Sequence, residues 1–175
     1  FLGREPRGER VDVSGHTGVL NYEPTELVLT VRSGTSIAEA QAVLYESGQC
    51  LAFEPPEFES AATIGGTIAS GFSGPCRPYR GSVRDFVLGV TCVNGRGESL
   101  RFGGQVMKNV AGYDVSRLMV GAMGTLGAIL DVSFKVLPMP EVEQTRVYEV
   151  SEEMAITKMN EWAAQPWPLS AACYL

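Results

Sequence analysis

Alternating apolar and polar residues predict β-strands in the first part of the chain. Residues 19–22 and 27–32 are rich in β-branched and aliphatic side chains, and a turn-forming segment precedes the first of them. Residues 11–13 carry the same pattern in a shorter run. We therefore predict three strands before residue 33.

Residues 36–47 are predicted to form a helix with one apolar face. Ser36 and Glu39 have the spacing of a capping box, and apolar residues recur at helical spacing up to Gly48, a stop signal. Residues 49–53 then return as a strand. This order predicts a β-α-β unit, in which the helix packs on a sheet.

The middle of the chain predicts a β-hairpin, a short helix and a long strand. Residues 86–93 and 99–102 are strand-like and flank a glycine-containing loop at 94–97. The loop does not continue as the G-x-G-x-x-G dinucleotide motif, because a leucine stands where the third glycine would be. The helix is predicted at 114–120 and the long strand at 128–137.

Two prolines at residues 138–140 mark the clearest change of pattern and the predicted domain boundary. We predict one domain over residues 1–138 and the beginning of a second over 139–175. The second part is predicted to contain a strand, a helix and another strand, at residues 145–150, 151–165 and 171–175.

Residues 61–74 carry no charge and few large side chains. The segment holds four glycines and four hydroxyl residues, which are Gly65, Gly66, Gly71, Gly74, Thr63, Thr67, Ser70 and Ser73. Glycine lets a backbone approach another group closely, and hydroxyls beside free N–H groups hold phosphate or carbonyl oxygens. A turn-rich crossover between buried strands fits the pattern equally well.

Charge and composition narrow the classes of partner. The net charge of −6, without a basic stripe, argues against a nucleic-acid partner. No apolar run reaches the ~20 residues that span a bilayer. Arg77, Arg80 and Arg84 face no matching acidic run, so they are candidates for binding a phosphate, a carboxylate or a partner protein.

The cysteines and the single histidine form no metal-binding motif. The four cysteines are widely spaced and include no C-x-x-C pair, which favours small core residues in a reducing compartment. They are Cys50, Cys76, Cys92 and Cys173. His16 has no carboxylate beside it in the sequence, so we interpret it as a surface turn residue rather than a catalytic base.

Four segments in fixed order resemble the FAD-binding domain of the vanillyl-alcohol oxidase and p-cresol methylhydroxylase (PCMH) family. They are residues 62–71, 80–90, 106–120 and 124–129. Within that family, residues 102–114 are most similar to the FAD-binding subunits of bacterial glycolate oxidases. The resemblance covers nearly the whole chain, and the ordered combination is more specific than any single glycine pattern.

The resemblance implies an α+β fold in which two subdomains hold FAD between them and a cap domain follows. The family's first pyrophosphate loop is expected before residue 1, and residues 139–175 are expected to begin a cap domain that continues beyond them. The residues implied in cofactor binding are Pro55, Ala62, Thr63, Ile64, Gly65, Gly66, Thr67, Ser70, Gly71, Gly74, Gly81, Asp85, Val87, Gly127 and Ile129.

Two departures from the family bear on how the flavin is held. Relatives carry Ser-Glu where this chain has Ala122-Met123, which removes one carboxylate on the flavin side. Some members attach flavin covalently through a histidine or cysteine, but neither His16 nor Cys76 stands at a matching position. The resemblance therefore implies non-covalent FAD.

The function implied is a flavoprotein subunit of a complex that oxidises glycolate or another small 2-hydroxy acid. A companion FAD subunit and an iron–sulfur subunit are the implied partners, and the implied location is cytoplasmic, at the inner face of the membrane through those partners. No general base is identifiable, so the catalytic residues stay unassigned. The alternative is a degenerate flavin fold that serves assembly, and a nucleotide-sugar reductase is a weaker third hypothesis.

Overall fold

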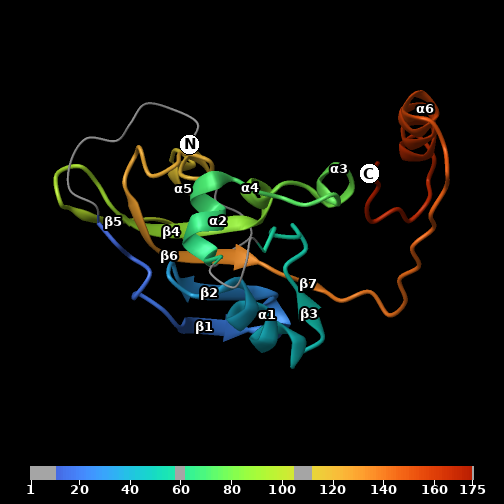
Figure 1. Cartoon of the computed structure of the whole chain (residues 1–175). Helices are drawn as coiled ribbons and strands as arrows, with labels where there is room; N and C mark the ends of the chain where they lie inside the picture. The colour runs from blue at the N-terminus through green and yellow to red at the C-terminus, as the bar shows by residue number, and fades with distance from the viewer. Residues whose placement is uncertain (1–10, 58–61, 105–111, 175) are drawn as a thin grey trace.

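A five-stranded antiparallel sheet forms the centre of the computed structural model, which describes residues 11–57, 62–104 and 112–174 (Figure 1). Every neighbouring pair of strands is antiparallel. The spatial order is β1 (Val19–Glu23), β2 (Val28–Arg32), β6 (Ala128–Lys135), β4 (Val87–Val93) and β5 (Ser99–Gly103).

One face of this sheet is apolar because alternate residues of each strand point to the same side. Leu29 pairs with Phe134 across β2 and β6, and Val132 lies between Val31 and Val90. All five of these side chains are buried. They form the core, to which aromatic rings add edge and tilted contacts.

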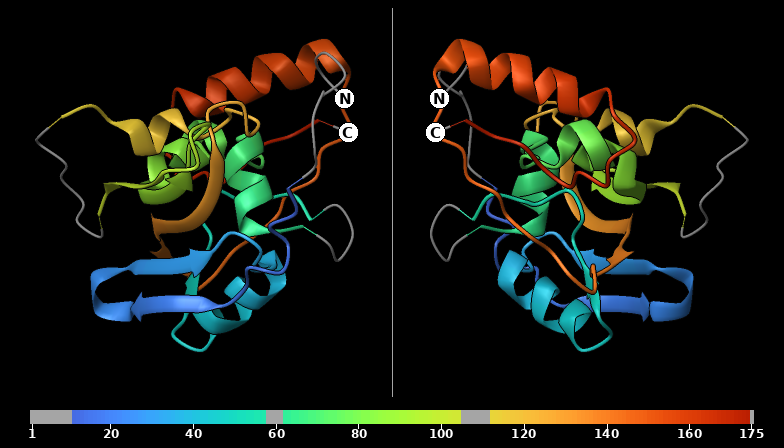
Figure 2. Two further views of the ribbon diagram at one scale, coloured as in Figure 1. Left: turned by 90° about the vertical axis from the view of Figure 1, so that its left-hand side faces the viewer. Right: turned by 90° about the vertical axis from the view of Figure 1, so that its right-hand side faces the viewer.

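Two helices, α1 (Ile37–Tyr45) and α2 (Ile64–Ser70), lie on the same side of the sheet (Figure 2). Helix α1 begins as predicted, because the Ser36 hydroxyl oxygen accepts a hydrogen bond from the Glu39 N–H. Its buried residues Ile37, Ala40 and Leu44 belong to the same core as the apolar residues of α2. The helices therefore close the apolar face of the sheet.

Short elements connect these parts. One-turn helices follow β1, precede β4 and precede β6, and a second sheet of two short strands lies beside α1. These elements are η1 (Pro24–Glu26), α3 (Arg77–Arg80), α4 (Val83–Phe86), α5 (Val115–Leu118), β3 (Gln49–Cys50) and β7 (Leu137–Pro138).

The predicted β-α-β unit is wrong in its pairing. Strand β2 lies in the large sheet, whereas β3 pairs with β7 in the small one. The predicted strand at 49–53 also stops at Cys50, because only Gln49 and Cys50 find partners, in Pro138 and Leu137. Residues 51–53 instead form a buried turn.

Two further predictions for the first half need correction. Residues 11–13 form no strand, since they lie outside every ladder of the described sheet. Residues 64–70 form helix α2, where the sequence predicted a backbone cradle or a turn-rich crossover. The other strands and helices predicted before residue 138 are present, with ends that differ by at most two residues.

The chain beyond β7 runs away from the sheet and carries α6 (Glu152–Ala163), which stands apart from the sheet in Figure 1. The predicted helix at 151–165 is confirmed, with Ser151 as its N-cap. The strands predicted at 145–150 and 171–175 are wrong for the described residues, because neither segment has a paired neighbour. Residues 105–111, which belong to the resemblance to the flavin family, lie outside the described part of the chain.

Candidate functional site

The glycine-rich segment folds as a helix because both of its ends are capped. Thr63 is the N-cap, and its hydroxyl oxygen accepts a hydrogen bond from the Gly66 N–H at 3.1 Å. Gly71 ends the helix in the left-handed region, with φ of 72°. Between these caps Ile64 and Ile68 stand four residues apart and are buried in the core.

The first amides of α2 are engaged within the chain, contrary to the expectation of free N–H groups. The Ile64 N–H donates to the Thr35 carbonyl at 2.9 Å, and the Gly65 N–H donates to the Ser33 carbonyl at 2.8 Å. The Thr67 N–H donates to the Thr63 carbonyl at 3.0 Å. Contact with a cofactor along this turn therefore depends on shape and on the remaining polar groups rather than on these amides.

Several of the predicted glycines are required by the packing of the chain on itself. A Cβ at Gly65 would stand 2.5 Å from the Ser33 Cβ, and one at Gly74 would stand 2.5 Å from the Glu54 Cβ. A Cβ at Gly127 would lie 2.6 Å from the carbonyl oxygen of Val93. None of these positions has room for a side chain, whatever ligand is bound.

Gly66 is different, because it is exposed and leaves a face of α2 without a side chain. The closest neighbour of a Cβ at this position would be the Thr63 hydroxyl oxygen, at 3.1 Å. Of the predicted site glycines, Gly66 is therefore the one at which the backbone is open to close approach from outside.

Hydrogen bonds join the C-terminal end of α2 to two other predicted parts of the site. The Gly121 N–H donates to the Ile68 carbonyl at 3.0 Å, and the Met123 N–H donates to the Ala69 carbonyl at 2.8 Å. The Arg84 guanidinium donates to the Val120 carbonyl at 2.9 Å. The fold thus brings α2, α4 and residues 119–123 together.

Met123 has a positive φ of 54°, which is uncommon for a residue with a side chain. Its side chain is 57% exposed, next to Gly124, which also has a positive φ. The resemblance to the flavin family leads us to expect a carboxylate at this position. An exposed apolar side chain therefore stands at this edge of the candidate site in place of a charge.

Asp85 forms a capping box at the start of α4. Its carboxylate accepts hydrogen bonds from the Ser82 N–H at 2.8 Å and from the Ser82 hydroxyl at 2.9 Å. These bonds, the one from the N–H first, hold the pKa of the Asp85 carboxyl below its ordinary value. Gly81, with φ of 102°, lets the chain turn into this box.

The predicted cofactor-binding residues divide by exposure. Gly66 and Asp85 are exposed. The half-buried members are Ala62, Thr63, Ser70, Gly71, Gly74, Gly81 and Gly127. The buried members are Pro55, Ile64, Gly65, Thr67, Val87 and Ile129. Of the buried group, Ile64, Val87 and Ile129 belong to the hydrophobic core.

Cys76 is a buried structural residue. Its N–H donates to the Glu54 carboxylate at 2.8 Å, and its thiol donates to the Ala52 carbonyl at 2.9 Å. Burial, reinforced by Glu54, raises the pKa of the thiol to about 12. The core role predicted for the cysteines holds for Cys76 and Cys92, whereas Cys173 is exposed.

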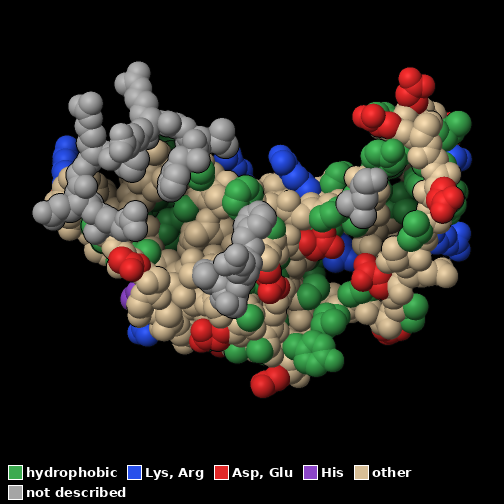
Figure 3. Space-filling model, in the orientation of Figure 1, with side chains coloured by type: hydrophobic (Ala, Val, Ile, Leu, Met, Phe, Trp, Pro, Cys, Tyr) green, Lys and Arg blue, Asp and Glu red, His purple; other side chains and the backbone are tan. Residues whose placement is uncertain are grey.

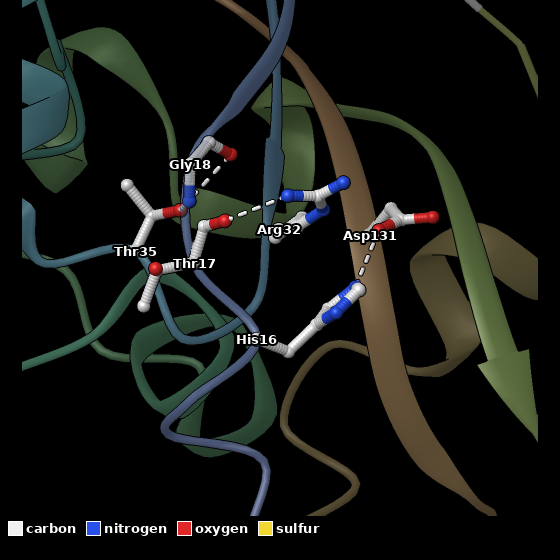
Figure 4. A network of polar contacts seen from close by, with 6 residues as sticks. All are labelled: His16, Thr17, Gly18, Arg32, Thr35 and Asp131. Carbon is white, nitrogen blue, oxygen red and sulfur yellow. Dashed lines mark hydrogen bonds and ion pairs between the residues drawn. The ribbon is translucent and has the colours of Figure 1, made fainter.

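His16 has a carboxylate partner that the sequence did not reveal. Its Nε2 lies 3.0 Å from the Oδ1 of Asp131 on β6, and the two side chains are 39% and 25% exposed (Figure 4). The loop that carries His16 lies beside the end of β2, because the Arg32 N–H donates to the Gly18 carbonyl at 3.0 Å. Arg32 pairs with Asp131 across β2 and β6, so His16 and Asp131 meet across 115 positions of sequence. Alternation in the 128–137 strand placed Asp131 on its polar face, but only the register identifies its partner.

A polar hollow of about 220 Å³ lies on the open face of the sheet. Its polar side chains come from all five strands and are Asn21, Thr30, Thr91, Arg101, Asp131 and Ser133. The Thr30 and Ser133 hydroxyls are 2.9 Å apart at its base. Sequence reasoning did not identify this hollow, since cross-strand register alone gathers its residues.

The site has features that suit a large cofactor held mainly through backbone and shape. The Ser33 hydroxyl is buried beside Gly65 and has no hydrogen-bond partner among the described residues, so a polar group is unsatisfied next to α2. Gly66 offers an open backbone surface on the same turn. The residues present are therefore compatible with FAD.

Neither a metal-binding cluster nor a membrane-spanning helix is found among the described residues. Within residues 11–57, 62–104 and 112–174, no three His, Cys, Asp or Glu side chains are grouped so as to hold a metal ion. The described helices include none with the length and apolar character needed to cross a membrane.

Three of the matches to known proteins illustrate what the chain is similar to. The chain is 51% identical over 174 residues to glycolate oxidase subunit GlcE of Escherichia coli (strain K12), a match that covers 99% of this chain and 50% of GlcE. It is 34% identical over 154 residues to glycolate oxidase subunit GlcD of Bacillus subtilis (strain 168), covering 86% of this chain and 32% of GlcD. The solved structure of an alkyldihydroxyacetonephosphate synthase matches 73% of this chain and 22% of its own, with a TM-score of 0.61 and 27% identity.

The chain therefore spans about half the length of GlcE. A family model described as FAD binding domain matches residues 3–103, more than half of the chain. These findings confirm the predicted α+β fold and the prediction of FAD as cofactor. The chain belongs to the FAD-binding domain family.

Proposed function

We propose that this chain is the FAD-binding part of a subunit in a complex that oxidises glycolate or a related 2-hydroxy acid. The observation that carries the proposal is the 51% identity to GlcE over 99% of the chain. Other relatives bear related names, among them a D-lactate dehydrogenase of Anaerostipes hadrus that is 31% identical over 134 residues. The substrate class common to these names is the small 2-hydroxy acid.

FAD, when bound, supplies the acceptor for the hydrogen at C2 of such an acid. The part of this chain is to hold and orient the cofactor and to exclude water from it. We assign this role to residues 62–74 with Pro55, to Gly81, Asp85 and Val87, and to the beginning of β6 from Gly127 to Ile129. The exposed backbone at Gly66 and the unsatisfied Ser33 hydroxyl support the first of these groups.

Non-covalent attachment is part of the proposal. The Cys76 thiol is fully buried and its pKa is raised to about 12, so it is neither accessible nor ionised near neutral pH. His16 is engaged with Asp131 on β6. Denaturation in acid should therefore release the flavin unchanged, and flavin that stays with the precipitated protein would contradict this part of the proposal.

The proposal extends to a multi-subunit assembly, which is supported by the names of the relatives as glycolate oxidase subunits. We propose a companion FAD subunit and an iron–sulfur subunit as partners, with electrons passing to the latter, and a cytoplasmic location at the inner face of the membrane through these partners. No described residue is assigned as a general base, so the reacting groups are proposed to lie in the companion subunit. Residues 139–174 are proposed to begin a second domain.

The test is a flavin spectrum of the full-length protein. We expect a yellow preparation with flavin absorbance, or a colourless one that gains a perturbed flavin spectrum when FAD is added. FAD should be recovered after acid treatment and should co-purify in a fixed ratio to protein. A colourless protein whose addition leaves the spectrum and fluorescence of FAD unchanged would overturn the proposal.

The second candidate function is an interaction subunit built on a flavin fold. It is favoured by the engaged amides at the start of α2, which leave fewer donors for a cofactor. Exposed Arg77 and Arg84 would then belong to a partner surface. Substitution Gly66→Val separates the two functions, because it should lower flavin content under the first and leave both flavin content and complex assembly unchanged under the second.

A further inference from the structure

Three segments that are distant in the sequence are stacked beside the candidate site. The loop 13–18 contacts the turn Ser33–Thr35, where the Gly34 N–H donates to the His16 carbonyl at 2.9 Å. The turn in turn contacts the start of α2, where the Gly65 N–H donates to the Ser33 carbonyl at 2.8 Å. Main-chain hydrogen bonds therefore connect His16, through the turn Ser33–Thr35, to the glycine-rich helix α2.

Neither of the two contacts within the stack has room for an added Cβ atom. A Cβ at Gly34 would clash with the backbone of Val13 and Ser14. A Cβ at Gly65 would stand 2.5 Å from the Ser33 Cβ. Since backbone meets backbone or the first side-chain atom at both contacts, a shift of the loop is passed on to α2 rather than absorbed by side chains.

Three side-chain contacts hold the outer layer of the stack, the loop 13–18, and they are shown in Figure 4. His16 Nε2 lies 3.0 Å from Asp131 Oδ1 on β6. The Arg32 guanidinium donates to the Thr17 carbonyl at 3.0 Å, and the Thr35 hydroxyl oxygen accepts from the Gly18 N–H at 2.9 Å. Arg32 is the last residue of β2 and Thr35 belongs to the turn, so of these three contacts only His16–Asp131 joins the loop to β6.

We propose that the His16–Asp131 pair is a positioning pair for the cofactor, which acts through the stack on the start of α2. The inference rests on the proposed function, because the group positioned is the FAD assigned to residues 62–74. The pair touches neither cofactor nor substrate. It supports the outer side of the turn Ser33–Thr35, on which the Gly65–Gly66 backbone packs, and through this turn it affects the fit of the flavin. The turn is also bonded to β6 directly, since the Ser33 N–H donates to the Leu130 carbonyl at 2.7 Å.

The first test measures FAD affinity of the full-length protein by titration of flavin fluorescence. Substitutions His16→Ala and Asp131→Ala are each expected to weaken FAD binding about threefold to fivefold, the range set by a half-exposed pair. The double variant should bind FAD no more weakly than the single variant with the lower affinity, because the two side chains act as a unit. Glu98→Ala is the control, since it removes one exposed hydrogen bond in the β4–β5 hairpin and should leave the affinity unchanged.

The second test needs no flavin and measures amide hydrogen exchange in the free protein. His16→Ala is expected to speed exchange at the Gly34 and Gly65 N–H groups, with no change at amides of the β4–β5 hairpin. Unchanged exchange at both groups would overturn the proposal even if FAD affinity falls. Faster exchange in a protein that binds no FAD would overturn the proposed function and the positioning role together, and would leave the stack as a purely structural contact.

Losses that add in the double variant would also overturn the pairing, because independent effects of the two residues predict addition. Equal FAD affinity in all variants with a lowered thermal midpoint would assign the pair to stability alone. His16→Gln serves as the conservative variant, since its side-chain amide can still donate to Asp131, and it should retain more affinity than His16→Ala.

Discussion

Gly65 and Gly66 are adjacent in sequence and have opposite surroundings. Gly65 is buried against Ser33, whereas Gly66 is exposed on the same turn of α2. A glycine motif read from sequence treats them alike. The structure assigns the first to the packing of the chain and leaves the second open to a ligand.

Substitution Gly65→Ala should therefore lower the free energy of unfolding by about 1–3 kcal/mol, the usual cost of overpacking a tight site. Gly66→Ala should change it by less than ~1 kcal/mol, because the helix preference of alanine over glycine is offset by the tight contact of its Cβ with the Thr63 hydroxyl, at 3.1 Å. FAD affinity should nevertheless fall in Gly66→Ala, through its added methyl group. Urea denaturation and FAD titration of the two variants measure both effects, and equal destabilisation by both would contradict the assignment.

Asp85 makes a pH-dependent contribution to stability. Hydrogen bonds from Ser82 lower its pKa in the folded chain, so the ionised carboxylate favours folding. This contribution is fully present above the unfolded value of about 4 and is lost as the pH falls through the folded pKa. The difference in unfolding free energy between the native protein and Asp85→Asn should be largest near pH 7 and should shrink below about pH 4. Urea denaturation across this range tests it, and a difference that does not vary with pH would contradict it.

At the scale of elements, α2 depends on its caps because its composition does not favour a helix. Two glycines and two threonine or serine residues fill four of its seven positions. The Thr63 cap, the Gly71 stop and burial of two isoleucines compensate. Loss of one cap should therefore lower the stability of the whole sheet, because α2 packs against it.

Substitution Thr63→Ala should lower the free energy of unfolding by about 1 kcal/mol, as loss of an N-cap hydroxyl does in other helices. Thr63→Ser keeps the oxygen and should restore most of the loss. Ser151→Ala removes the equivalent cap of α6, outside the sheet, and is the matched control. Circular dichroism during urea denaturation reports the midpoint of the sheet. A Ser151→Ala effect as large as that of Thr63→Ala would show that α2 has no special role.

The sequence predicted the elements whose signals are local. The Ser36 cap, the 94–97 hairpin and the alternation of β6 all lie within a few residues of what they determine. Helix α2 was missed because its glycines indicate a loop, although the Ile64–Ile68 spacing, the Thr63 cap and the Gly71 stop together indicate a helix. Segments 145–150 and 171–174 have strand composition, but no strand of the described part of the chain pairs with them, so they form no ladder there.

The candidate site was predictable only in part. The resemblance to the flavin family singled out residues 62–74, and that assignment stays a proposal. The stack that supports this segment was not predictable, because contacts such as His16–Asp131 and Gly65–Ser33 depend on the register of β2 and β6 and on where α2 packs. Sequence separation of 115 positions leaves no local signal for the first of them.

At the scale of the whole molecule, residues 139–174 differ from the sheet that precedes them. Only Ala155 of α6 is buried, and apolar side chains gather on the surface of this part in Figure 3. Val142 and Val147 are 86% and 88% exposed. One of the contacts within this part is between the rings of Tyr148 and Trp162, whose centroids are 5.2 Å apart.

Both tryptophans of the chain, Trp162 and Trp167, lie in this second part. Tryptophan fluorescence therefore reports on residues 139–174, whereas circular dichroism is dominated by the sheet and its helices. If the predicted boundary at residue 138 separates two units, the two signals of this 175-residue chain should change at different urea concentrations, with fluorescence changing first because few of its contacts are buried.

Trp162→Phe supplies the control, since it should change the fluorescence amplitude and leave the transition seen by circular dichroism in place. Coincident transitions at every urea concentration would contradict the boundary, because a single cooperative unit requires all probes to agree. Because the valines of this segment are exposed, we expect the fluorescence and circular dichroism transitions to differ. Burial of so little apolar surface cannot hold residues 139–174 to the sheet with the cooperativity of a shared core.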